Sequence, residues 1–292
     1  MVKQLVLMLT IFGCMNGQLN AQYYERASAF YNTLIGAFTG AIGSVINKKK
    51  EEKWYASLIK GFGFGAGGGM LMYSGKKLNH LIAENSKPVY AWLSRAVYSA
   101  GNSLVENAAA GRKWWEVWHY DIGFIRLEYQ AVKARIQPRI MPSVFLGTLF
   151  LGAHGKFDIR TSFFYGTPVF RTPSIHYAQN LYASTPTNGF LMVDTLTDKN
   201  LFSKIYAHEM IHAFQFQDFS GVNYFFQPIT NKWKLKSTRF AKWSKWIYGD
   251  LNYEIMVVNY FFIQKGHKHL NYCENFLENE AETLSTGQPA CK

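Results

Sequence analysis

The sequence His208-Glu209-Met210-Ile211-His212 holds two imidazoles and a carboxylate at a spacing that suits metal chemistry. On a helix, residues four apart lie on one face, so both imidazoles can reach the same Zn²⁺ at about 2.0–2.1 Å. Glu209 follows the first histidine, where its carboxylate can take a proton from a water beside the metal. The segment therefore predicts that His208 and His212 bind zinc and that Glu209 is a general base.

A catalytic zinc also needs a third protein ligand and an open position for water. The carboxylates that suit this role lie in residues 275–284, a segment that is predicted to form a helix. Glu278 and Glu282 share one face of it, and the small Ala281 beside them allows close packing on the first helix. We expect Glu278 to bind zinc and Glu282 to accept the second N–H of a histidine. Glu280 points elsewhere and is the weaker ligand candidate; the alternative is a solvated acidic helix start, stabilised by the helix dipole.

This combination resembles the gluzincins, the His-Glu-x-x-His peptidases whose third zinc ligand is a glutamate on a later helix. The pattern Glu278-x-x-Ala281-Glu282 is most similar to the Glu-x-x-Ala-Asp element of membrane-associated peptidases related to the prenyl-protein and HtpX-type proteases. Glu282 stands where those proteins have aspartate, and the likeness is confined to two short segments between Asp198 and Leu284. The resemblance implies a zinc-dependent enzyme that hydrolyses peptide or amide bonds, with a zincin-like pair of metal-binding helices.

Two other readings of the pentapeptide stay open. The chain can be a non-enzymatic envelope protein in which the motif is structural or accidental, or a degenerate peptidase that keeps zinc for stability. His267, His269 or Tyr253 can supply a donor to a substrate oxyanion, and the sequence does not choose among them. His119 lies in an aromatic cluster and is expected to be a packed core or interface residue.

The elements that must position these residues indicate an α+β fold with a mixed or antiparallel sheet. Asp198 is a plausible N-cap, and neither glycine nor proline interrupts the following residues up to Phe219, so the pentapeptide should lie on a helix. A second helix is expected over 89–110. Alternating or apolar runs predict strands over Gly123–Tyr129, Ser143–Leu151, Phe157–Tyr165 and Phe190–Val193, with residues 152–155 as a turn.

Residues 22–112 form a glycine-rich, helical region that precedes the expected catalytic domain at 113–292. Residues 27–47 carry no charge, and Gly36, Gly40 and Gly43 recur at helical intervals. Small residues at such spacing let helices approach closely, as in membrane hairpins, so this region is either membrane-inserted or a tightly packed, water-soluble layer. A second stretch, 61–69, is so rich in glycine that its helicity is expected to be weak.

The N-terminus has the layout of a secretory signal. A positive charge at Lys3 precedes an apolar run, and Ala21 is the expected last residue removed, which makes residues 1–21 a signal peptide. A lipoprotein signal with Cys14 as the lipidated residue is the alternative. We therefore expect export to the periplasm or outer envelope, where Cys273 and Cys291 either form a disulfide or stay as thiols.

The formal charge of +12 comes from short, scattered basic clusters. No recognised nucleic-acid motif accompanies them, so we expect no nucleic-acid partner. An anionic membrane surface or cell-wall polymer fits better. The partner that the metal motif predicts is a protein or peptide substrate, and nothing in the sequence defines its specificity pocket.

Overall fold

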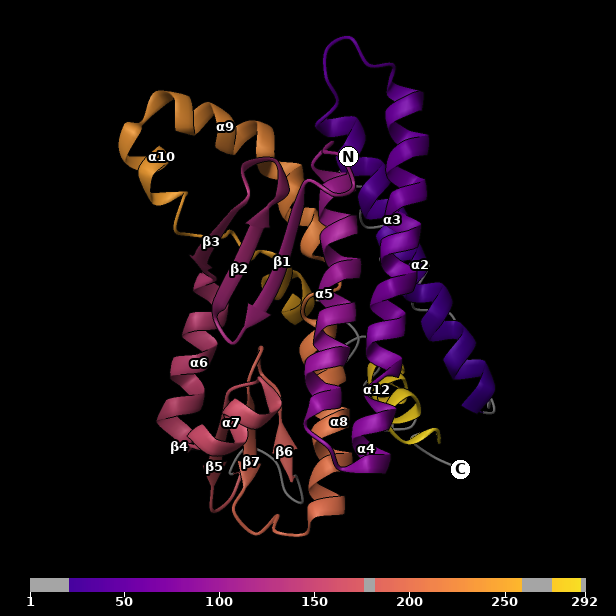
Figure 1. Cartoon of the computed structure of the whole chain (residues 1–292), viewed down its shortest axis with the longest axis vertical. Coiled ribbons are helices and arrows are strands. Elements are labelled where there is room, and N and C mark those ends of the chain that lie inside the picture. The colour runs from indigo at the N-terminus through magenta and orange to yellow at the C-terminus, as the bar shows by residue number, and fades with distance from the viewer. Residues whose placement is uncertain (1–20, 176–181, 259–274, 290–292) are drawn as a thin grey trace.

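The structure is a computed structural model that describes residues 21–175, 182–258 and 275–289. The N-terminal part is a layer of helices that run roughly along the longest axis of the molecule (Figure 1). In chain order these helices are α2 (Ala21–Ile46), α3 (Trp54–Lys77), the short α4 (His80–Asn85) and α5 (Val89–Ala109). The helix expected over 89–110 is therefore confirmed as α5.

Glycines bring α2 and α3 into backbone contact. A Cβ added at Gly36 would lie 2.3 Å from the carbonyl oxygen of Gly65, and one at Gly40 would lie 2.3 Å from that of Gly61. The expectation of weak helicity for residues 61–69 is wrong, because α3 is continuous across them. Each glycine there costs up to about 1 kcal/mol of helix propensity, and the close packing that glycine permits offsets that cost.

Helix α2 is apolar as well as closely packed. Its stretch Tyr23–Ile46 is long and apolar enough to cross a membrane, by length and composition, and it is the one such helix in the described part of the chain. About half of its most apolar window, 56%, is buried against other parts of the protein. An N-terminal apolar helix is compatible with export or membrane association. The predicted signal residues, including Cys14, lie outside the described residues.

Two small sheets make the fold a mixture of helix and sheet, as expected for the α+β class. The first is antiparallel, in the order β1 (Val117–Ile122), β2 (Ile125–Gln130), β3 (Arg135–Ile140). The second has the order β4-β5-β7-β6, in which β5 and β7 are parallel and the outer pairs antiparallel. Its strands are β4 (Lys156–Phe157), β5 (Val169–Thr172), β6 (Ala183–Ser184) and β7 (Phe190–Val193). The strands expected at 123–129 and 190–193 are confirmed, with a shift of two residues at the start of β2.

Two predicted strands are wrong. Residues 143–151 lie in α6 (Pro142–His154), which also runs through the expected turn, and residues 159–165 form α7 (Ile159–Tyr165). Residues 143–151 are uncharged and mostly apolar, and such a run does not distinguish strand from helix by periodicity. Residues 157–160 alternate apolar and charged side chains, which imitates a strand over a short stretch. The signals that favour helices here are local: Pro142 at the first turn of α6, and Asp158, whose carboxylate accepts the backbone N–H of Thr161 at the start of α7.

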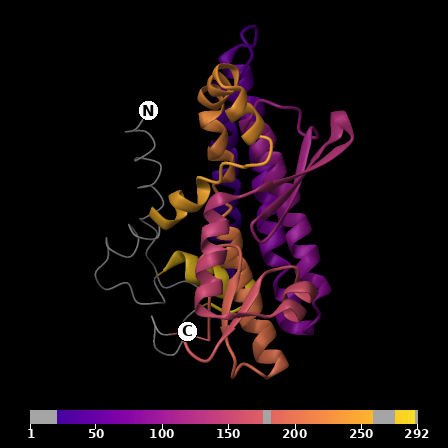
Figure 2. The ribbon, with the colours of Figure 1, turned by 90° about the vertical axis from the view of Figure 1, so that its left-hand side faces the viewer.

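The C-terminal part supplies the pentapeptide helix and its partner. Helix α8 (Lys199–Gln215) begins at Asp198, as predicted, and ends four residues earlier than expected. It is followed by η2 (Ser220–Phe226), α9 (Gln227–Lys236), α10 (Thr238–Trp243) and α12 (Phe276–Thr286). Figures 1 and 2 place α8 beside α5, with α12 across it. The ring of Tyr98 on α5 stacks on that of Phe214 on α8 with 4.1 Å between centroids, so the N-terminal helices and α8 share a core.

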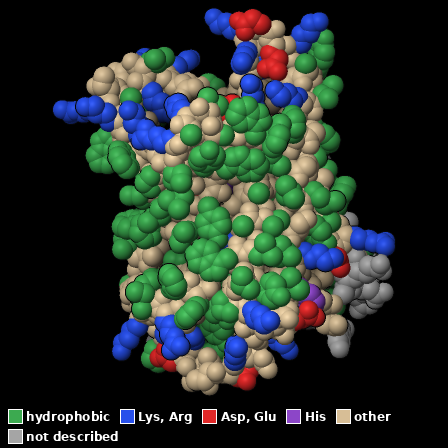
Figure 3. Space-filling model, in the orientation of Figure 1, with side chains coloured by type: hydrophobic (Ala, Val, Ile, Leu, Met, Phe, Trp, Pro, Cys, Tyr) green, Lys and Arg blue, Asp and Glu red, His purple; other side chains and the backbone are tan. Residues whose placement is uncertain are grey.

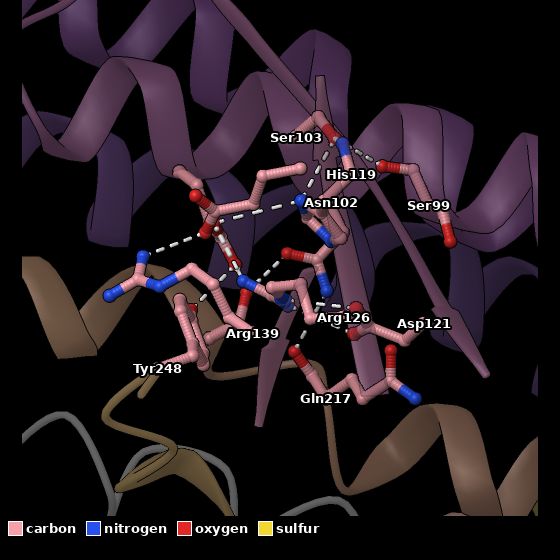
Figure 4. Close-up of polar contacts among 12 residues, drawn as sticks. Ser99, Asn102, Ser103, His119, Asp121, Arg126, Arg139, Gln217 and Tyr248 are labelled. Carbon is pink, nitrogen blue, oxygen red and sulfur yellow. Dashed lines mark hydrogen bonds and ion pairs between the residues drawn. The ribbon is translucent and has the colours of Figure 1, made fainter. Parts of the chain in front are cut away.

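A buried charge cluster fixes the antiparallel sheet to α5 (Figure 4). The Arg126 guanidinium donates to Asp121 at 2.9 Å and to Glu106 at 2.9 Å, and it lies 3.7 Å from the centre of the Tyr248 ring. His119 is buried beside them, with its Nδ1 3.0 Å from the Ser103 hydroxyl. The expectation that His119 is a packed residue is confirmed.

Candidate metal centre

Helices α8 and α12 bring three metal-binding side chains together. His208 and His212 lie one turn apart on α8, and their Nε2 atoms are 3.0 Å apart. Glu278 on α12 places its Oε2 atom 3.3 Å from each of these nitrogens. Ligand atoms of the three residues all lie within 4.8 Å of one another, so the group could hold a metal ion. The side chains of His208, His212 and Glu278 are 14%, 17% and 16% exposed, so the group is partly accessible to solvent.

The second nitrogen of each imidazole is already engaged. Nδ1 of His208 lies 3.1 Å from Oε2 of Glu282, and Nδ1 of His212 lies 2.8 Å from Oε1 of Gln215. The Gln215 amide nitrogen donates to the Leu277 carbonyl oxygen at 2.9 Å, so the amide oxygen faces His212 as an acceptor. Both Nδ1 atoms therefore donate, and in the neutral rings both Nε2 atoms present lone pairs.

Three lone-pair atoms thus face one another with no donor between them: two Nε2 atoms and a carboxylate oxygen. Three such electron-rich atoms at this distance require positive charge between them, either protons or a metal ion. Burial lowers the pKa of His208, but hydrogen bonds to Glu278 and Glu282 outweigh it and raise that pKa to about 10. Burial likewise lowers the pKa of His212, and the Glu278 charge raises it overall. Burial raises the pKa of Glu278, yet the two imidazoles hold it well below its usual range.

The approach of α12 to α8 depends on a small residue at the contact. Ala281 is fully buried and packs with Ile211 and Leu284 in one apolar cluster. Helix α12 begins at Asn275, whose side chain accepts the backbone N–H of Leu277 at 3.0 Å. This start fixes the phase of the helix, so Glu278 and Glu282 face α8.

Glu280 faces away from the metal group and into a buried ion network. Its Oε2 atom lies 3.1 Å from the Lys76 ammonium on α3 and 2.8 Å from the Gln215 amide nitrogen. Lys76 also lies 2.7 Å from Asp218, which follows α8, and all three charged side chains are at most 1% exposed. Asn32 on α2 donates to the other Glu280 oxygen at 2.8 Å. The glycine-rich helices therefore hold α12 through the residue between Glu278 and Glu282.

Glu209 has its own partner on the second sheet. The Thr185 hydroxyl, next to β6, donates to Oε2 of Glu209 at 2.5 Å. The Glu209 charge is near enough to raise the pKa of both His208 and His212. Glu209 is 8% exposed, so its carboxylate is held rather than solvated.

The structure brings together His208, His212, Glu278 and Glu282, with Glu209 beside them. Tyr253 lies elsewhere: its ring stacks on Phe216 in a cluster with Met141. His267, His269, Cys273 and Cys291 lie outside the described residues.

Apart from Glu282, the sequence did not indicate which residues contact the histidines and carboxylates of this group. Gln215 lies three residues after His212, a spacing that places both on one helix face and could have indicated contact. Lys76, Asp218 and Thr185 carry no such signal, because their positions depend on how distant segments pack.

Comparison of the chain with protein-family models, curated proteins and solved structures found no match.

Proposed function

We propose that this chain is an exported zinc metallopeptidase that hydrolyses peptide or amide bonds in proteins or peptides. The observation that supports it most is the set of three converging lone-pair atoms from His208, His212 and Glu278. Two nitrogens and one carboxylate oxygen match the three protein ligands of a catalytic zinc site. A zincin-like helix pair, α8 with α12, is the architecture that this proposal implies.

The residues around the ligands have separate roles in this proposal. When bound, zinc supplies a Lewis acid that polarises a carbonyl and lowers the pKa of water. Glu282 and Gln215 hold the two imidazoles in the tautomer that leaves each Nε2 free to bind. Glu209 takes the proton of the attacking water and delivers it to the leaving amine, and the Thr185 hydroxyl orients that carboxylate.

Zinc content and hydrolysis, measured on the same samples, test the proposal. The protein, purified without chelators, should hold one zinc per chain and cleave a fluorescence-quenched casein. Glu209→Ala should keep zinc and lose cleavage, whereas His208→Ala or His212→Ala should lose both. His154→Ala, at an exposed residue that ends α6, is the matched control and should change neither.

The outcomes separate the proposal from its alternatives. Absence of zinc from the wild-type protein refutes the metal site. Stoichiometric zinc without cleavage of casein or of a mixed peptide library refutes the peptidase and favours a structural metal in an envelope protein.

A further inference from the structure

Helix α3 has large apolar side chains on the outside and small residues on the inside. Its buried residues include Gly61, Gly65, Gly68 and Gly69, which face α2 and α5. Its exposed residues are mostly large and apolar, and they run almost the whole length of the helix: Trp54, Tyr55, Leu58, Ile59, Phe62, Phe64, Met70 and Leu71. From Trp54 to Gly75 the one charged residue is Lys60.

Helices α6 and α7 also expose large apolar side chains. No charged residue occurs from Pro142 to Ala153, and α6 exposes Leu146 at 65% and Leu149 at 54%. Helix α7 exposes Phe163 at 75%. The Trp92 side chain on α5 is also exposed and donates to the Phe164 carbonyl oxygen at 2.9 Å, which joins α5 and α7 at the surface.

On the neighbouring helices α5 and α2, polar groups face the interior. Arg95, Asn102 and Glu106 on α5 are at most 2% exposed, and so are Ser28 and Asn32 on α2. In water, a helix hides its apolar side and exposes its polar side. In a bilayer, where the surroundings are apolar, helices pair through small residues and internal polar contacts. The apolar face made by the outer sides of α3, α6, α7 and the start of α5 follows the second pattern.

The extent and borders of this apolar face fit a bilayer. Figure 3 shows hydrophobic side chains across the middle of the molecule and charged side chains towards both ends, with more Lys and Arg than Asp and Glu among them. Lys53 precedes α3 and Lys77 is its last residue. The 24 residues of α3 span about 36 Å, close to the roughly 30 Å of a hydrocarbon core. Exposed Lys232, Lys234 and Lys236 on α9 add charge at one end, and Lys87 lies just before α5 at the other.

We propose that the apolar face lies against the hydrocarbon of a lipid bilayer, with its basic borders at anionic headgroups. The apolar patches of water-soluble monomers rarely exceed a few hundred Å², whereas this face extends over four helices. A second copy of the chain is the less suitable occupant. A two-fold pairing of the face would set basic ends against basic ends in either orientation, which costs free energy, while an anionic membrane neutralises both. The inference does not depend on the metal site.

Flotation with vesicles tests it on the full chain. The protein, purified in mild detergent, is mixed with phosphatidylglycerol-containing vesicles, freed of detergent and washed in high salt before flotation. The double variant Leu146→Glu with Leu149→Glu places charge on the apolar face. The matched control is Leu235→Glu, the same change at a residue on α9 that is 90% exposed and lies off this face.

We expect the wild-type protein and Leu235→Glu to float and resist the salt wash. The double variant should show a bound fraction of at most about one tenth of the wild-type value, because each carboxylate would have to enter hydrocarbon. Unchanged far-UV circular dichroism shows that both variants fold. A wild-type protein that stays monomeric in detergent-free buffer and does not float overturns the proposal. So does a water-soluble wild-type dimer that the double variant splits, since a second copy then covers the face. Equal loss of flotation in Leu235→Glu overturns it as well.

Discussion

Removing the Lys76 ammonium should destabilise the whole chain, although the residue lies in a glycine-rich helix far in sequence from the metal site. The ammonium sits between Asp218 at 2.7 Å and Glu280 at 3.1 Å, and none of the three side chains is more than 1% exposed. Lys76→Met keeps most of the side-chain volume and leaves two buried carboxylates without their counter-charge. Breaking one side of a buried ion pair costs about 3–5 kcal/mol of unfolding free energy, and we expect a loss in that range.

The adjacent lysine provides the control. Lys77 is 56% exposed and pairs with Glu25, which is 38% exposed, so Lys77→Met should cost no more than about 1 kcal/mol. Urea unfolding of the wild-type protein and both variants, in the same buffer and with metal removed, gives the two losses. Zinc affinity should also fall in Lys76→Met alone, because Glu280 is the residue that anchors α12 beside Glu278.

The loss should depend on pH in a defined direction. Burial raises the pKa of Asp218 to about 7 even though Lys76 lowers it, so removing Lys76 should raise this pKa further. A carboxyl group with a raised folded-state pKa contributes stability below its unfolded value, near 3.9, and that stability is lost as pH rises through the folded pKa. The loss of unfolding free energy in Lys76→Met, relative to the wild-type protein, should therefore be larger at about pH 9 than at about pH 6. Equal losses for the two lysine variants, or a deficit that shrinks as pH rises, would refute the buried network.

Three further predictions concern the site and the helices. Gln215→Ala should raise the zinc dissociation constant about 10- to 100-fold in a chelator competition, because His212 loses the acceptor that fixes its tautomer. Zinc should bind more tightly as pH rises toward 10, because the raised pKa of His208 means that protons compete with the metal. The affinity should rise about tenfold per pH unit for each proton displaced, as measured by chelator-buffered zinc titrations across that range. Gly65→Ala should lower the thermal unfolding midpoint, because the added Cβ would lie 2.1 Å from the Gly36 carbonyl oxygen, whereas Gly63→Ala, with nothing within 4 Å, should leave it unchanged or raise it.

The convergence of His208, His212 and Glu278 could be predicted in part because helix geometry is local. A spacing of four on α8 and on α12 places each pair on one face whatever the rest of the chain does. Ala281 gave the reason for the two helices to approach, and the structure packs it on Ile211. The network behind the ligands could not be predicted. Lys76 and Asp218 are separated by 142 positions, and one lysine among many carries no sign of a buried partner.

The fold shows the same limit. The strand at β2 was predictable from its alternation of apolar and charged residues, since that pattern requires one buried face. Helices α6 and α7 were not, because most of their large apolar side chains face outward, so the sequence lacks the stripe by which a water-soluble helix is recognised. Helix α3 was misjudged for a related reason: its glycines lower helix propensity, and only contact with α2 shows what they are for.

X-ray absorption at the zinc K-edge tests directly whether His208, His212 and Glu278 bind zinc. We expect a four-coordinate zinc with nitrogen and oxygen neighbours at about 2.0–2.1 Å and the outer-shell signal of two imidazoles. One imidazole should disappear in any His212→Ala protein that retains metal. A purified protein without zinc, or a zinc with sulfur neighbours at about 2.3 Å, would contradict the assignment of His208, His212 and Glu278 as the metal site.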